Sequence, residues 1–216
     1  MRGIGAAVWC VLAAAALTAC DADSARYAQT GAQAVRLKAI LADMAGLPAG
    51  FSGRLRDGWR APFKPKAGAC ARVFDLISGR PPRKGLDAAA AGAYQGAQVG
   101  ETAGVTLSVY AGDGAAEQLE RTRDELDACV AADGRAPGAG NHLTSGPLPV
   151  HPIGDGVESR RLRGRAGGYP YEMQVVVARA DQTLVAIVHA GMRPPDARRT
   201  EELARAVAAK VGTLDP

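Results

Sequence analysis

The chain of 216 residues is poor in aromatic side chains, which make up 5% of it, and it lacks the motifs of the common enzyme classes. It contains no G-x-S-x-G, which a hydrolase nucleophile elbow would need, no CxxC pair and no HExxH zinc motif. The histidines His142, His151 and His189 are far apart, and none has a second ligand at metal-binding spacing. We therefore expect no enzyme activity, catalytic residue, cofactor or bound metal.

The chain also lacks a strong charge of either sign and a hydrophobic run long enough to span a membrane. Its formal net charge is +4, with Lys and Arg scattered along the sequence, which does not support nucleic-acid binding. The longest apolar run, from Ile4 to Leu17, falls short of the roughly 20 residues that a transmembrane helix needs. Following Arg2, this run is typical of a cleaved secretory signal.

The signal ends in Leu17-Thr18-Ala19-Cys20, which resembles the bacterial lipobox. In that family the Cys thiol receives a diacylglyceryl group and a signal peptidase cuts just before it. The resemblance implies that residues 1–19 are a lipoprotein signal peptide, that Cys20 carries the lipid, and that residues 20–31 are a polar, flexible spacer. Two acyl chains anchor a protein durably, so we expect a lipid-anchored protein on the extracytoplasmic face of the cell membrane.

The remaining cysteines follow from this assignment. Cys10 leaves with the signal and Cys20 is acylated, so Cys70 and Cys129 remain as a pair in an oxidising compartment. A disulfide between them is favoured, and it would stabilise the fold by roughly 4 kcal/mol by closing a loop of about 60 residues. A metal site and a reactive thiol are the weaker alternatives, since neither Cys has a neighbouring ligand or base.

Hydrophobic periodicity predicts one α+β domain over residues 32–216, with an antiparallel β-sheet and helices packed mainly on one face. The predicted strands alternate apolar and polar residues or are β-branched, and Asp181-Gln182 predicts a tight hairpin. The predicted helices cover residues 32–44, 70–77, 115–132 and 196–211. The predicted strands cover residues 88–96, 104–110, 157–165, 171–179 and 183–189, with an irregular strand near 148–153.

Two groups of residues are candidates for binding. Arg161, Arg163 and Arg165 would point to one side of an extended strand, where their guanidinium groups could contact an anionic headgroup or wall polymer. The alternative interpretation is a charged edge strand, and it is favoured. Phe51, Trp59, Phe63, Tyr169 and Tyr171 could line a ligand cleft, but a chain with so few aromatics needs them for its core.

Several short segments resemble actinobacterial lipoproteins related to the extracellular sensor domain of PknH-type serine/threonine kinases. They are Leu47-Pro48-Ala49-Gly50-Phe51, the Cys70 helix, Val105–Tyr110 before the Cys129 helix, Gly154-Asp155-Gly156, the hairpin Arg179–Ile187 and the C-terminal helix. The resemblance implies an extracytoplasmic binding domain without catalysis. Those sensor domains usually carry two disulfides, whereas this chain can form one.

Two functions follow as hypotheses. The first is a non-catalytic ligand-binding or sensor-type lipoprotein at the cell envelope, acting through a groove beside its sheet. The alternative is a structural or accessory lipoprotein that binds an envelope protein partner and no small molecule. A concave, partly apolar pocket with a few polar groups would favour the first.

Overall fold

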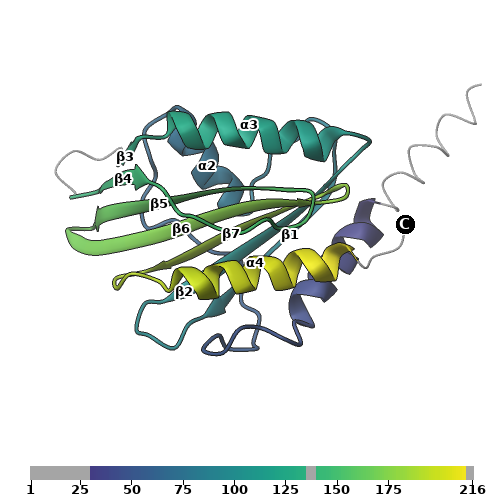
Figure 1. Ribbon diagram of the computed structural model, residues 1–216, viewed down its shortest axis with the longest axis horizontal. Helices are drawn as coiled ribbons and strands as arrows, with labels where there is room; N and C mark the ends of the chain where they lie inside the picture. Colours follow the sequence, from purple (N-terminus) through teal and green to yellow (C-terminus); the bar gives the residue numbers. More distant parts are fainter. Residues whose placement is uncertain (1–29, 135–139, 213–216) are drawn as a thin grey trace, which may run out of the picture.

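The computed structural model describes residues 30–134 and 140–212, which form a seven-stranded antiparallel sheet with helices packed on it (Figure 1). The strand order is β1-β2-β7-β6-β5-β4-β3. The predicted α+β class with an antiparallel sheet is therefore confirmed. In chain order the elements are a helix over residues 30–42, α2 (Ala69–Ile77), β1 (Leu86–Gln95), β2 (Thr102–Tyr110), α3 (Gly114–Ala128), β3 (Ala131–Asp133), β4 (His142–Gly146), β5 (Gly156–Ala166), β6 (Tyr169–Ala180), β7 (Thr183–Gly191) and α4 (Ala197–Gly212).

The helices cover both faces of the sheet, and the prediction of one helical face is wrong. Helix 30–42 and α4 pack on one face through residues such as Leu41 and Leu203, whereas α2 and α3 pack on the other through Phe74 and Leu126 (Figure 1). The reason lies in the central strands. β7 is buried at every position, so both faces of the sheet must be shielded from water.

The region between α3 and β5 differs from the prediction. α3 ends at Ala128 rather than at residue 132, and Val130, expected to face inward, is 69% exposed. Short strands β3 and β4 follow, while residues 148–153, expected as an irregular strand, pair with no strand. Because β4 pairs with β5 over residues 161–165, the arginine-rich segment is not a sheet edge. The favoured interpretation of these arginines as a charged edge is therefore wrong.

Two covalent and local features match the sequence. Cys70 and Cys129 form the predicted disulfide, which joins the start of α2 to the end of α3. The β6–β7 hairpin turns at Asp181 and Gln182 as predicted, with Asp181 in the left-handed region at φ 54°. The Asp155 carboxylate accepts a hydrogen bond of 2.7 Å from the Asp181 amide and so fixes this turn.

Candidate functional site

A cleft of about 1070 Å³ lies beside β1, the outermost strand, on the face of the sheet that carries α2. Its volume matches the upper end of the range of about 300–1,000 Å³ that is typical of ligand sites. The walls come from the segment before α2, from α2 and its C-terminal turn, and from β1. The lining residues are Asp57, Gly58, Trp59, Arg60, Ala61, Phe63, Lys64, Pro65, Ala71, Phe74, Asp75, Ser78, Gly79, Arg80 and Ala91.

The segment over residues 57–65 is held in place by its aromatic side chains. Trp59 is 6% exposed and packs directly over Gly104 of β2, where a Cβ would lie 2.3 Å from the Trp59 Cβ. Tyr171 packs against the same hydrophobic cluster, and burial raises its pKa to about 12. Phe63 is also buried, with its ring centroid 5.6 Å from that of Phe74. The cleft wall is thus part of the hydrophobic core on this face.

The polar side chains of the cleft carry more positive than negative charge. Arg80 donates two hydrogen bonds to the Asp75 carboxylate, at 3.0 and 2.7 Å, so these two charges offset each other. Arg60 and Lys64 are exposed and form no ion pair with any residue the structure describes, which leaves their charges available to a ligand. Ser78 Oγ is buried and makes no hydrogen bond within the same part of the chain.

Of the five candidate aromatics, the structure brings two into the cleft. Trp59 and Phe63 line it while also serving the core, so both interpretations of the sequence hold for them. Tyr171 is half-buried and packs against the hydrophobic cluster that contains Trp59. Phe51 packs on the opposite face of the sheet, and Tyr169 is 68% exposed at the start of β6.

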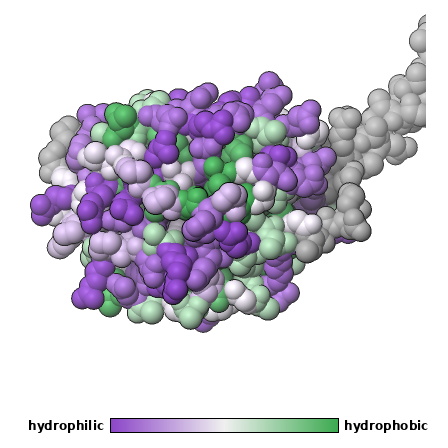
Figure 2. All heavy atoms as spheres, in the orientation of Figure 1, coloured by the Kyte–Doolittle hydropathy of each residue, from purple (hydrophilic) through white to green (hydrophobic). Residues whose placement is uncertain are grey.

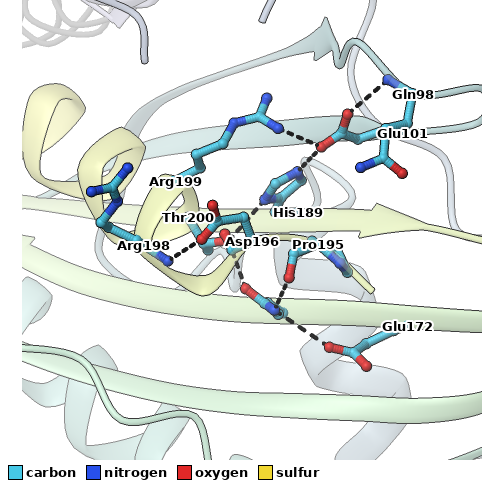
Figure 3. A network of polar contacts seen from close by, with 10 residues as sticks. Gln98, Glu101, Glu172, His189, Pro195, Asp196, Arg198, Arg199 and Thr200 are labelled. Carbon is cyan, nitrogen blue, oxygen red and sulfur yellow. Dashed lines mark hydrogen bonds and ion pairs between the residues drawn. The ribbon is translucent and has the colours of Figure 1, made fainter. Parts of the chain in front are cut away.

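A second polar feature, a buried network on the opposite face, centres on His189 (Figure 3). His189 lies on β7 and is 0% exposed, with Nε2 2.9 Å from Glu101 Oε1. Arg199, on the first turns of α4, donates a hydrogen bond of 3.0 Å to the same oxygen. The Gln98 amide donates to the other carboxylate oxygen. Glu101 therefore receives three donors from three separate segments of the chain.

The network continues from His189 toward β6 (Figure 3). Thr200 Oγ1 lies 2.8 Å from His189 Nδ1 and 2.6 Å from Gln174 Oε1. Gln174 Nε2 donates to the Pro195 carbonyl at 2.8 Å. The Asp196 carbonyl, 3.1 Å from Thr200 Oγ1, is a third possible acceptor. Since Thr200 has one hydroxyl proton, it donates to only one of these groups at a time when His189 is neutral.

Burial and the neighbouring charges set the protonation of this pair. Burial lowers the pKa of His189, although the hydrogen bond and charge of Glu101 act in the opposite direction. Burial raises the pKa of Glu101, but the Gln98 amide, His189 and the Arg199 charge outweigh it, so that this pKa is lowered. The pair is thus a carboxylate beside a neutral imidazole near neutral pH.

The order hydroxyl, imidazole and carboxylate in Thr200, His189 and Glu101 is that of a nucleophile activated by a base. Thr200 is 0% exposed, however, and its hydroxyl is enclosed by β6, β7 and α4. A substrate has no access to it. The network contributes to the packing of α4 on the sheet rather than to a catalytic site.

The three arginines of β5 that are candidates for anion contact have partners within the protein. Arg161 and Arg163 lie 3.3 and 3.1 Å from the carboxylate oxygens of Glu172, whose side chain is 4% exposed. Arg165 Nε donates to the Gly168 carbonyl at 2.9 Å. Two of the three guanidinium groups therefore offset a buried carboxylate. Contact of these arginines with an external anion stays a prediction.

The other histidines remain separate in the fold. His142 contacts Asp133 and His151 contacts Glu201, each at an exposed position. Among residues 30–134 and 140–212 no cluster of three or more His, Cys, Asp or Glu side chains could hold a metal ion. In the same ranges no helix combines the length and the hydrophobicity that crossing a membrane would require.

The face of the molecule in Figure 2 is covered mainly by hydrophilic residues, with small hydrophobic patches between them. The strongly exposed large apolar side chains of the described chain are separate in sequence: Val35, Val99, Val130, Tyr169 and Met192. Most exposed apolar side chains of this kind are ordinary on soluble surfaces. The cleft is therefore the feature of this surface that best fits a ligand.

Sequence reasoning missed most of the buried network. Glu101, Arg199, Thr200 and Gln174 are separated by up to 99 residues, and no spacing rule connects them. The one available signal was His189 itself, a polar residue that directly follows the continuous apolar run Leu184–Val188, where burial is expected. A buried imidazole needs partners for both ring nitrogens, which indicates a network without naming its members.

Comparison with known proteins adds information at the level of fold. No family model matches the chain, and no curated protein matches it. Among solved structures, an uncharacterized protein of Mycobacterium smegmatis, the Rv0999 ortholog, is similar with a TM-score of 0.43 and 17% identity, over 80% of this chain and 97% of that chain. The extracellular domain of PknH from Mycobacterium tuberculosis is similar with a TM-score of 0.56 and 12% identity, over 82% of this chain and 95% of that chain. The chain thus shares the fold of the PknH extracellular domain, as the resemblance of its sequence segments implied.

Proposed function

We propose that the protein is a lipid-anchored binding module on the extracytoplasmic face of the cell membrane, and that its cleft holds a ligand without changing it chemically. The cleft is the observation that carries this proposal. It combines the apolar walls of Trp59 and Phe63 with Arg60 and Lys64, two cations that form no ion pair within the described residues, and this is the composition of a recognition site. The burial of Thr200 and His189 supports a role without catalysis.

A side chain that fills the cleft tests the binding role. Ala71 lines the cleft from α2, so Ala71→Trp is expected to occupy the space between α2 and the segment over residues 57–65. Ala111→Trp is the matched control, because Ala111 is exposed in the turn between β2 and α3. Native mass spectrometry of the full protein purified from its own membranes should find a bound species on the wild type and on Ala111→Trp, but not on Ala71→Trp. A species that Ala71→Trp retains, or a wild type without one, would overturn the proposal.

The anchor is part of the same proposal and is carried by Cys20, which lies outside the described residues. Ten residue steps separate Cys20 from the helix over residues 30–42, so the domain can lie at most about 35 Å from the lipid. Cys20→Ala is expected to abolish acylation and to release the protein from the membrane fraction. Unchanged partition of this variant into membranes would refute the anchor and leave the cleft unaffected.

A further inference from the structure

The outer edge of β1 is open beside the cleft. β1 is the outermost strand, and Ala93 exchanges both backbone hydrogen bonds with Arg56 across its outer edge, at 2.9 and 3.1 Å. Because backbone groups alternate in direction along a strand, the N–H and C=O groups of Ala91 and Ala89 point to the same side. Within the part of the chain that the structure describes, neither residue has a backbone partner on that side.

The chain protects this edge at both ends and leaves its middle free. At one end the segment over residues 51–56 bridges to β1 at Gly96 and Ala93. At the other end a register shift between Leu86 and Ala88 interrupts the ladder. The opposite edge of the sheet is the three-residue strand β3. Free strand edges are usually shortened, bulged or charged to prevent pairing, so an open stretch between two protected ends indicates a place for a strand.

The open stretch leads directly into the cleft. Beyond Arg56 the chain leaves the edge and crosses onto the face of the sheet that carries α2. Gly58 lies on this face against Ala91, where a Cβ on Gly58 would be 3.3 Å from the Ala91 Cβ. Gly79, just after α2, lies against the same methyl group, and a Cβ on Gly79 would be 2.9 Å from the Ala91 Cβ. Residues 88–91 are all alanine, so no large side chain covers the backbone. A strand added here would place alternate side chains against the cleft walls.

The charges near this stretch select an acidic partner. Arg60 and Lys64 line the cleft and pair with no acidic residue of the described ranges, and Arg83 and Lys84 are exposed in the turn that leads into β1. Against these four cations stand Asp57 in the cleft and Asp87 at the start of β1, since Asp75 is already paired with Arg80. The local excess of positive charge favours a peptide that carries carboxylates.

From these observations we propose that the occupant of the cleft is an extended acidic peptide segment, which adds a strand to the edge of β1 at Ala89 and Ala91 and places an apolar side chain against the cleft-facing edges of Trp59 and Phe63. This inference rests on the proposed function and specifies the ligand of the same cleft. Backbone hydrogen bonds to the edge hold the peptide, and the aromatic walls select its side chain. The cations on the rim orient it.

Hydrogen exchange tests the strand directly. The probe is a pool of acetylated, amidated heptapeptides with a central Phe or Leu flanked by Glu and Val, added to the full protein in detergent. Saturating peptide is expected to slow exchange at the amides of Ala89 and Ala91 at least tenfold. The amides of Ala88 and Ala90, which already bond to β2, should change little. A pool with Lys in place of Glu, and a pool N-methylated at alternate positions, should bind at least tenfold more weakly by calorimetry.

A backbone variant separates strand addition from general cleft binding. Ala89→Pro removes an outward N–H without removing a hydrogen bond to β2, and proline is tolerated on edge strands at such positions. Its affinity for the Glu pool is expected to fall about fivefold or more, while the control Ala89→Ser keeps the wild-type affinity. Circular dichroism establishes that both variants fold.

The outcomes distinguish this inference from the proposed function. Unchanged exchange at Ala89 and Ala91 with the Glu pool, equal binding of the Lys pool, or full affinity of a folded Ala89→Pro would each overturn the peptide strand. The proposed binding role of the cleft would still be supported if a bound species is found on the wild type and on Ala111→Trp, but not on Ala71→Trp. If Ala71→Trp and Ala111→Trp do not differ in the bound species, the proposed binding role and the peptide strand are both overturned.

Discussion

Glu101 is expected to be the charged residue on which the stability of the fold depends most. Its carboxylate is 4% exposed and accepts hydrogen bonds from the Gln98 amide, His189 and Arg199. Two further nitrogens of Arg199, Nε and NH2, are buried without a hydrogen-bond partner in the described chain. Arg199 therefore depends on this one carboxylate to offset its charge.

Glu101→Gln keeps the shape of the side chain and removes its charge. Breaking a buried ion pair from one side typically costs 3–5 kcal/mol, because it leaves the other charge unpaired. Since the Arg199 side chain is still 17% exposed, we expect a loss at the lower end, about 3 kcal/mol in the free energy of unfolding. With a urea dependence of about 2 kcal/mol per molar, the midpoint of unfolding should fall by about 1.5 M.

Glu125→Gln is the matched control. Glu125 is 16% exposed and pairs with Arg72 at 2.7 Å, but that arginine is 59% exposed and can return to water. Its loss should cost under about 1 kcal/mol. Urea unfolding followed by circular dichroism at pH 7.5, with the disulfide intact, compares the two variants. A Glu101→Gln midpoint equal to that of Glu125→Gln would refute the assigned dependence of Arg199 on Glu101.

Three further measurements test other parts of the structure. Because the pKa of His189 is lowered, the unfolded chain takes up a proton below about pH 6.5 before the native state does, so stability should fall as the pH drops below about 7. His189→Gln should remove this slope in urea midpoints measured between pH 7.5 and 5.5, and a slope that persists would contradict the assignment. Replacing Cys70 and Cys129 together with Ser should cost about 4 kcal/mol in the chain-entropy account, since the bond spans a sequence separation of 59 residues; a change under 1 kcal/mol would show that the denatured chain is already restricted. Gly104→Ala should cost about 1–3 kcal/mol and disturb the fluorescence of Trp59, because the new Cβ meets Trp59 at 2.3 Å and Val188 at 2.9 Å, whereas Gly146→Ala meets nothing within 4 Å and should leave that fluorescence unchanged.

The sequence predicted the elements whose pattern is local. β2 and β6, with their β-branched residues, the hairpin at Asp181 and the C-terminal helix all appear close to their expected ends. The disulfide could also be predicted, because the assignment of Cys20 left one pair. The strand β1 was predictable only weakly, since its run of alanines has no hydrophobic period.

The distribution of the helices was mispredicted because the strands were interpreted as having one buried face. In β7 the apolar positions are consecutive rather than alternating, from Leu184 to Val188, and such a run requires cover on both sides. The pattern was present in the sequence. An antiparallel sheet more commonly has one exposed face, which predicts all helices on the other face, but the continuous burial of β7 excludes this arrangement.

The candidate site could be predicted only in part, for a different physical reason. A cleft forms where packing is left incomplete, and that depends on the tertiary arrangement of Gly58, Gly79 and Ala91 rather than on any period. Trp59 and Phe63 were identified as cleft or core, and they are both. The sequence could not decide between these roles because an aromatic wall shields the core on one side and faces the cleft on the other.

The buried network and the cleft lie on opposite faces of the sheet, and the segment over residues 50–65 connects them. Phe51 contacts His189 with ring centroids 5.0 Å apart, and the Arg199 guanidinium lies 4.5 Å from the Phe51 centroid. From there the chain bridges β1 at Ala93, crosses its edge and places Trp59 in the wall of the cleft.

The Arg199 charge of the network thus contacts the start of segment 50–65, and the end of the same segment forms the wall of the cleft. Hydrophobic contacts alone would hold the segment at Trp59, whereas the stacking of Arg199 on Phe51 also fixes its other end. With both ends fixed by these contacts, we expect the segment to keep its position when the cleft is empty, which would make the site preformed. Preformed sites lose less conformational entropy on binding, so the buried charges across the sheet would favour binding of the ligand that we propose for this cleft.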